Sequence, residues 1–319
     1  MQSLFSRISP DSRPSVIASG FIVVILLVGT VYTLMTQGTA PLLSPNYMLQ
    51  QLQTGAFLGI VAAGMMMVIL LGHIDLSIPW TLTAAAMMAT TVGGDLAIPT
   101  AIGVGVAVGL ANGIGVAYLR IPSMIFTLGI DSVLRGLMVA HTGGFAPPDQ
   151  ATPLMRFLAA DKVLGIPVAI FVWALVSVVI AFILKRTSFG RSVYATGNRE
   201  AAAYLSGINT RWVIIGAFVI SGVCAALAGV LLAGYSAKAY QGMGNAFLLP
   251  SIAAVVLGGT RILGGQGSYT GTIIGVVLIV LLNSVLSIMQ MPEAGRQVIY
   301  GSVIVGMLLV YGRGQKVVS

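Results

Sequence analysis

Ionisable side chains are scarce in the apolar stretches of this chain, so the few present indicate what chemistry is possible there. Asp131 and Arg135 lie four residues apart in one such stretch, and Thr127 precedes Asp131 by four. In a helix, this spacing places all three side chains on one face. A carboxylate and a guanidinium so spaced can neutralise each other and stabilise a helix bundle, or they can form a polar wall that contacts a solute. The spacing is compatible with both.

A second polar group, His73 and Asp75, lies where another apolar stretch ends. Gly72 frees the backbone there, and Pro79 is tolerated in the first turn of a following helix. Asp75 or Ser77 is therefore expected to cap that helix, a role that we favour over ligand contact for Asp75. His73 could titrate near neutral pH or contact a hydroxylated ligand. A hydrogen-bonded interfacial histidine is the simpler interpretation.

A third polar stripe follows the spacing i, i+4, i+7 at Asn283, Ser287 and Gln290, which predicts hydrogen bonds between helices. The consecutive G-x-x-x-G steps between residues 105 and 113 predict close helix packing. The candidates for a polar path through the helices are His73, Asp75, Thr127, Asp131, Arg135, Asn283 and Ser287.

Enzymatic chemistry is not expected. The two histidines, His73 and His141, are not accompanied by a G-x-S-x-G elbow or a metal-binding carboxylate pair. The glycine-rich run LGGTRILGGQGSYTG (257–271) lacks the G-K-[ST] ending of a phosphate loop, so the chain is not expected to bind ATP. The single cysteine, Cys224, lies in an apolar run and is expected to pack in the core.

The composition is that of an integral membrane protein. Of 319 residues, 57% are hydrophobic and only 8% are charged, against about 25% in soluble domains. The mean hydropathy is +0.99. The net charge of +8 comes from basic residues in short loops and tails, as expected for a membrane protein and not for a nucleic-acid-binding one.

About ten apolar stretches are long enough, or nearly so, to cross a membrane. The first follows Arg7 and Arg13, is longer than a signal-peptide core and is expected to be retained. The third and eighth are short or broken by glycine, so they are expected to be bent or re-entrant. The stretches are 16–36, 55–72, 78–93, 96–118, 122–141, 166–184, 212–233, 250–262, 271–289 and 296–311.

An even number of crossings places both termini on one side of the membrane. With both inside, eleven basic residues face the cytoplasm, including Arg7, Arg313 and Lys316, and four face out. The chain is thus predicted to be one transmembrane domain over 1–319, with a cytoplasmic loop at about 185–211 and a periplasmic loop at about 142–165. No internal sequence repeat is evident.

The cytoplasmic loop contains a short polar helix in an otherwise apolar chain. Asn198 is expected as its N-cap, Glu200 suits the first turn, and Gly207 suits its end. Ala201–Ala203 are strong helix formers. A helix of about two turns is marginal alone in water, so it must pack against something.

The segment EAAAYLSGIN (200–209) resembles the coupling helix of ABC importer permeases, in particular those for ribose, xylose, arabinose and galactose. Three further segments resemble motifs of this family, in the same order and at similar spacing. They are GHIDLS (72–77), LRIPSMIFTLGIDSVLRGL (119–137) and IAAVVLGGTRILGGQGSYTGTIIG (252–275). The similarity covers roughly residues 50 to 312.

The resemblance implies an all-α membrane protein with ten helices, the ABC importer permease fold, in a bacterial inner membrane. It implies ATPase partner subunits that bind ATP and Mg²⁺, a second permease subunit, identical or homologous, and a periplasmic solute-binding protein. This chain, which is embedded in lipid, would bind no cofactor or metal of its own and would pass a small polyhydroxylated solute, a monosaccharide above all. The residues implied in ATPase coupling are Asn198, Arg199, Glu200, Ala201, Ala202, Ala203, Leu205 and Gly207.

The chain departs from the family pattern at three places. His73 replaces a glycine, Asp131 replaces a neutral residue, and the loop 142–165 resembles nothing common to the family. An alternative is therefore a secondary carrier driven by an ion gradient, in which Asp131, Arg135 and His73 would couple ion and solute.

Overall fold

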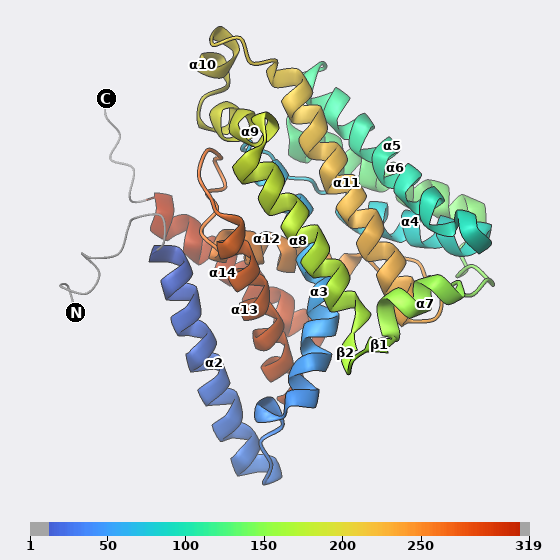
Figure 1. The fold of residues 1–319 in the computed structure, drawn as a ribbon, viewed down its shortest axis with the longest axis vertical. Coiled ribbons are helices and arrows are strands. Elements are labelled where there is room, and N and C mark those ends of the chain that lie inside the picture. Colours follow the sequence, from blue (N-terminus) through green and yellow to red (C-terminus); the bar gives the residue numbers. More distant parts are fainter. Residues whose placement is uncertain (1–12, 313–319) are drawn as a thin grey trace, which may run out of the picture.

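The computed structural model describes residues 13–312, so Arg7, Arg313 and Lys316 lie outside the described residues. The chain is almost entirely helical (Figure 1). Its longer helices are α2 (Arg13–Gln37), α3 (Pro45–Ile69), α4 (Ile78–Val92), α5 (Ala97–Ala117), α6 (Ser123–Thr142), α8 (Val168–Arg186), α11 (Thr210–Tyr235), α12 (Leu248–Leu257), α13 (Tyr269–Ile288) and α14 (Glu293–Gly312).

Shorter elements lie at the two ends of the bundle. One end, called here the α10 end, carries α9 (Ser188–Asn198) and α10 (Glu200–Leu205). The opposite end, the α7 end, carries α7 (Pro153–Ala160) and an antiparallel hairpin of β1 (Lys162–Val163) and β2 (Ile166–Pro167). The 3₁₀ turns are η2 (Pro41–Leu43), η3 (Gly94–Leu96) and η4 (Asn245–Phe247).

The ten longer helices correspond to the ten apolar stretches of the sequence. Within the described residues, seven helices are long and apolar enough to cross a membrane, and α4 and α12 are shorter apolar helices. The all-α membrane architecture is thus confirmed. Two boundaries differ from expectation. The helix α3 starts ten residues early, at Pro45, because proline fits the first helical position, and α12 ends at Leu257, before two glycines.

Two groups of four helices repeat the same pattern. The helices α3, α4, α5 and α6 have 25, 15, 21 and 20 residues, and α11, α12, α13 and α14 have 26, 10, 20 and 20. In both groups the second helix is the short one. The first helix of one group runs toward the α10 end and that of the other runs away from it, so the repeats are inverted (Figure 1).

Local details support this repeat, which the sequence did not make evident. Arg120 and Gln290 both adopt left-handed backbone conformations, with φ of 56° and 55°, and each lies two residues before a proline. The segments SVLRGLM (132–138) and SVIVGML (302–308) also correspond, at the same offset of 170 residues. Conserved turn geometry with little sequence identity explains why the repeat was not predicted.

The centre of the molecule is formed by α3 and α11, the two most buried candidate spans. The helix α5 packs closely on α11 because glycines let the backbones approach. A Cβ at Gly105 would lie 2.4 Å from the Gly222 carbonyl oxygen, and one at Gly109 would lie 2.5 Å from that of Phe218. The predicted close packing is confirmed, and Cys224 is buried in this core as expected.

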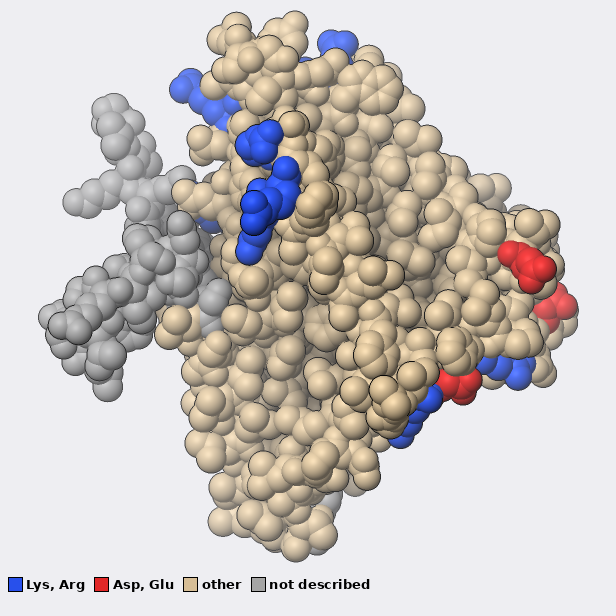
Figure 2. Space-filling model, viewed as in Figure 1, with Lys and Arg blue, Asp and Glu red and all other residues tan. Residues whose placement is uncertain are grey.

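The surface separates into zones. On the face shown in Figure 2, Lys and Arg side chains gather near α8 and α9, and side chains of both charges lie toward the α7 end. Lys185 and Arg186 occupy the last turn of α8 at the α10 end. A broad uncharged belt separates the zones, as expected for a surface that faces lipid.

Candidate functional site

The candidate site is the α9–α10 segment, which protrudes from one end of the bundle (Figure 1). Thr187 caps α9 by accepting a hydrogen bond from the Gly190 N–H at 3.1 Å. Because α9 then continues to Asn198, this residue ends a helix, and its predicted role as an N-cap is wrong. The extended residue Arg199 (φ −160°) separates α9 from α10.

Two other predictions for the short helix are confirmed, namely Glu200 in its first turn and Gly207 at its end. Glu200 lies in the first turn of α10. Gly207 has a φ of +83°, its N–H donates to the Tyr204 carbonyl at 3.0 Å, and the Ile208 N–H donates to the Ala203 carbonyl at 3.1 Å. This is a Schellman motif, in which glycine closes the helix.

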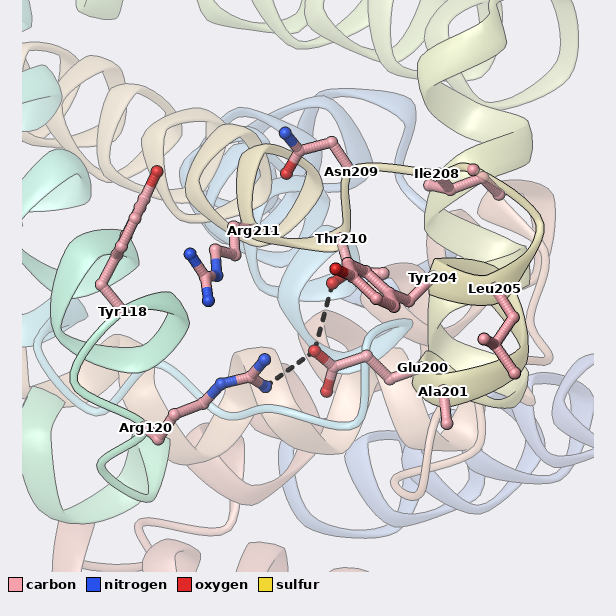
Figure 3. Close-up of a pocket in the computed structure, with 11 residues that line it drawn as sticks. Tyr118, Arg120, Glu200, Ala201, Tyr204, Leu205, Ile208, Asn209, Thr210 and Arg211 are labelled. Atoms are coloured by element: carbon pink, nitrogen blue, oxygen red, sulfur yellow. Dashed lines mark hydrogen bonds and ion pairs between the residues drawn. The ribbon is translucent and has the colours of Figure 1, made fainter.

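Glu200 ties α10 to two other elements. Its Oε1 accepts hydrogen bonds from Arg120 Nη1 at 2.8 Å and from Thr210 Oγ1 at 3.2 Å (Figure 3). Arg120 lies in the turn between α5 and α6, and Thr210 is the first residue of α11. One carboxylate therefore joins the short helix to both repeats.

A hollow of about 870 Å³ lies beside this ion pair (Figure 3). It is bounded by the C-terminal end of α5, by α10 and by the start of α11. At the edge of this hollow, the Arg211 guanidinium lies 5.0 Å from the centre of the Tyr118 ring, which is a cation–π contact.

The residues assigned to coupling do not share one environment. Ala201, Ala202 and Gly207 are exposed, as are Asn198 and Arg199. Leu205 is 85% exposed and its neighbour Tyr204 is 70% exposed, so α10 presents an apolar tip to the outside. Ala203 is buried and faces the bundle. The short alanine thus lets α10 lie close to its own chain.

Three backbone segments meet beneath α9, and we call this contact the glycine junction. It joins residues 70–72 after α3, Gly197 in α9, and Gly264–Gly265 in the loop between α12 and α13. The Gly265 N–H donates to the Leu70 carbonyl at 2.9 Å. A Cβ at Gly197 would lie 1.8 Å from the same carbonyl oxygen. The glycine-rich run therefore serves a backbone contact.

The break between α3 and α4 is held by one face of α6. The N–H groups of three residues in or just after this break donate to side chains on α6. The pairs are Ile74 to Ser123 at 3.3 Å, Leu76 to Thr127 at 2.9 Å, and Trp80 to Asp131 at 3.2 Å. Their acceptors, one helical turn apart, are Ser123 Oγ, Thr127 Oγ1 and Asp131 Oδ1. The polar face predicted for this helix therefore binds free backbone N–H groups of a broken helix.

Asp75 lies in a buried hydrogen-bonded cluster in the same break. It is 2% exposed. Its Oδ1 accepts from Ser77 N–H and Oγ at 3.0 and 2.6 Å, and from Asn112 Nδ2 at 3.4 Å. Its Oδ2 accepts from Ser221 Oγ at 2.9 Å. Asp75 thus caps the break and joins it to α5 and α11, and both of its carboxylate oxygens are hydrogen-bonded inside the protein.

The expected pair of Asp131 and Arg135 is not formed. Within residues 13–312 the ion pairs are Arg120–Glu200 and Glu293–Arg296. The Asp131 carboxylate turns toward the free N–H of Trp80, while Arg135 is exposed on the outer side of α6.

His73 lies in the break, outside the long helices, and lines a second hollow of about 510 Å³ together with Arg120 and Glu200. Burial lowers the pKa of His73 below 6.5, and the nearby Glu200 carboxylate offsets part of this effect. Burial therefore favours the neutral form of the imidazole. The interpretation of His73 as a partly buried interfacial residue fits this position better than that of a pH sensor.

The third polar stripe forms one of its predicted contacts. Asn283 Oδ1 accepts from Arg296 Nη1 and Tyr300 OH of α14, both at 3.1 Å. Ser287 and Gln290 are exposed, and Gln290 lies beyond the end of α13. The stripe thus connects helices at Asn283 alone among its three members.

Sequence reasoning missed several partners in these sites. Arg120, Asn112 and Ser221 each bond a residue that was singled out, but 35 to 146 residues away. The proline two residues after Arg120 is the one local sign in the sequence of the turn in which Arg120 lies. No group of three or more metal-binding side chains occurs in the described part of the chain.

Comparisons with known proteins agree with this arrangement. Residues 47–310 match the family described as "Branched-chain amino acid transport system / permease component". A probable ABC transporter permease protein, YphD, of Escherichia coli K12 is 36% identical over 91% of this chain and 88% of its own length. No solved structure matches.

Two further relatives have more specific names. The ribose import permease protein RbsC of E. coli K12 is 31% identical over 86% of this chain and 89% of its own length. The autoinducer 2 import system permease protein LsrC of Salmonella paratyphi B is 32% identical over 80% and 75%. The expected resemblance is thus confirmed, and the chain belongs to this family of ABC transporter permease components, which are membrane-spanning transport subunits and not enzymes.

Proposed function

We propose that the chain forms the path of an ATP-driven importer for a small polyhydroxylated solute, above all a monosaccharide. The observation that carries the proposal is the α9–α10 segment. It presents an exposed apolar tip of Tyr204 and Leu205 while Glu200 ties its base to both repeats. The relatives named for ribose and autoinducer 2 import support the solute class.

The partner at this end is an ATPase subunit, which binds ATP and Mg²⁺. Its closure on ATP would push on α10, and rigid contacts would pass the movement on. The contact at Glu200 leads to α6 and α11, and the glycine junction leads to the α3–α4 break. Such coupling biases a bundle between two conformations.

The partner at the outer face of α6 is a second permease subunit. Arg135 and Ser132 are exposed on this helix, and a Cβ at Gly129 or Gly136 would meet nothing within 4 Å. A permanently charged guanidinium is costly against lipid, and small residues permit close approach of another helix. By contrast, the exposed residues 16–35 of α2 carry no charge, as a lipid-facing helix requires.

A disulfide experiment tests this second subunit. Gly129→Cys on α6 is compared with Gly20→Cys on α2, where a Cβ would also meet nothing within 4 Å. Oxidation of native membranes is expected to link Gly129→Cys chains, or to link them to a homologue with a cysteine at that position, and to leave Gly20→Cys chains monomeric. Equal yields would remove the assignment of this face.

The orientation follows from the charges. The α10 end, with Lys185 and Arg186 beside the coupling segment, is the cytoplasmic end, and both termini lie in the cytoplasm of a bacterial cell with an inner membrane. A periplasmic binding protein would then deliver solute at the α7 end. The loop 142–165, which contains α7, would be exposed to it.

The test of the proposed function is co-purification with an ATPase from native membranes in mild detergent. Leu205→Asp is expected to abolish it, and Leu164→Asp is its control, because Leu164 is 95% exposed in the β1–β2 turn at the other end. Glu200→Lys and Gly207→Asp should abolish ATP-dependent uptake with the protein still in the membrane. Uptake that needs an ion gradient and no ATPase would overturn the proposal.

A further inference from the structure

A small cavity of about 160 Å³ lies in the half of the bundle that is nearer the α7 end. It is lined by α3 from one repeat and by η4, α12, α13 and α14 from the other. Its walls are partly apolar, from Leu58, Phe247 and Ile279. No residue assigned to ATPase coupling contributes to it.

The polar side chains of the cavity come from three helices. They are Gln51 and Thr54 on α3, Asn283 on α13, and Glu293 on α14. The oxygen of the Asn283 amide accepts from Arg296 and Tyr300, so its orientation is fixed and its N–H₂ group remains to donate. The cavity thus holds an oriented donor beside acceptor groups.

The corresponding place in the first repeat is filled. Asn112 on α5 corresponds to Asn283 on α13, because each lies five residues before the last residue of its helix, and Ser77 precedes α4 as Phe247 precedes α12. There the Asp75 cluster closes the space with hydrogen bonds of 2.6 to 3.4 Å. Ser221 of that cluster lies eleven residues into α11.

The position in α3 that corresponds to Ser221 in α11 is Ala56. Its neighbour Gly55 lines the cavity. One repeat therefore uses this site for a structural polar cluster, and the other leaves it open. The open site lies beside α12, the short helix of its repeat, and short helices at corresponding positions of inverted repeats mark binding sites in transporters.

We propose that this cavity is a binding site for a neutral polyhydroxylated solute the size of a monosaccharide, within each permease subunit on the side where solute enters. The inference rests on the proposed function. The charges agree with a neutral ligand, because Glu293 lies 3.7 Å from Arg296 and the pair leaves no net charge. Hydroxyl groups can donate to Gln51 and Glu293 oxygens and accept from Asn283, while C–H groups contact Phe247.

The size agrees as well. A volume of 160 Å³ corresponds to roughly five water molecules at about 30 Å³ each. The hydroxyl groups of a pentose or hexose can replace the hydrogen bonds of such waters, whereas a larger solute would extend beyond the cavity.

Uptake by the assembled transporter in proteoliposomes tests the site, with ribose, xylose, arabinose and galactose as radiolabelled probes. Gln51→Leu removes a polar wall group, and Gln50→Leu, which alters an exposed neighbour on α3, is the matched control. We expect Gln51→Leu to raise KM about three- to tenfold, the effect of one hydrogen bond, and Gln50→Leu to leave it unchanged. ATP hydrolysis without solute should be the same in Gln50→Leu as in the wild type.

Thiol labelling provides a second measurement that does not depend on turnover. Gln51→Cys should react with a small thiol reagent added from outside, and the sugar that wild type transports should slow the reaction. Cys224 is buried and should not react. Unchanged KM in Gln51→Leu, or no protection of Gln51→Cys, would overturn the site. Wild-type protein that takes up none of the probes would instead overturn the proposed function.

Discussion

Gly197→Ala provides a sharp test of the glycine junction, because two effects of opposite sign compete. Gly197 is the second-last residue of α9, where alanine is the better helix former by at most about 1 kcal/mol. A Cβ at this position would lie 1.8 Å from the Leu70 carbonyl oxygen, whereas ordinary contact begins at 3.4 Å. The clash is with backbone, so no side-chain rotation relieves it.

The cost should exceed the gain. Separating the two segments removes the hydrogen bond from the Gly265 N–H to Leu70, worth about 1 kcal/mol. Overpacking of a rigid contact costs about 1–3 kcal/mol more. We therefore expect Gly197→Ala to lower the free energy of unfolding by about 1–3 kcal/mol and to weaken the link from α9 to both repeats.

The control is Gly103→Ala in α5, where a Cβ would meet nothing within 4 Å. Thermal unfolding in detergent should show Gly103→Ala as stable as wild type or more so. ATP-dependent uptake should fall for Gly197→Ala alone. Equal midpoints for the two variants would refute the rigid junction.

Three further predictions concern the hydrogen bonds of the break and of α10. Thr127→Val should destabilise by about 1–3 kcal/mol, because the Leu76 N–H loses its acceptor without a change of volume, whereas Thr127→Ser should unfold near the wild-type temperature. Asp75→Ala should cost more than about 3 kcal/mol by leaving several buried donors unpaired, and Asp75→Asn much less; equal loss in both would mean that charge, not acceptance, matters. Glu200→Gln should change stability by less than about 1 kcal/mol, because its ion pair with Arg120 is largely exposed, yet it should reduce uptake; a fall in unfolding temperature as large as that of Gly197→Ala would contradict this.

The helices could be predicted because their apolar runs are continuous and their ends carry glycine or proline. Gly207 ends α10 as expected, and the glycines of α5 pack as expected. These features depend on residues a few positions apart. They are the part of a fold that a single sequence reveals most directly.

The site was predicted less well, because its contacts join distant residues. The spacing of Asp131 and Arg135 is right for a pair on one helix, but a free N–H of α4 lies closer to the carboxylate and binds it. Asn198 has the side chain of a cap, but Thr187 had already started the helix. In both cases a tertiary or neighbouring partner outweighs the local preference.

The break between α3 and α4 also has a consequence for synthesis of the chain in the membrane. The acceptor of the Leu76 N–H is Thr127 on α6, which is synthesised 51 residues after Leu76. Ser221, which donates to Asp75, is synthesised 146 residues after Asp75. At about 5–20 residues per second, the latter interval lasts roughly 7–30 s. During that time the carboxylate needs water or the insertion machinery as a partner, and the free N–H groups need the same until α6 has been made. We therefore expect α4 to leave the insertion machinery late, together with α11, although α4 is synthesised well before α11.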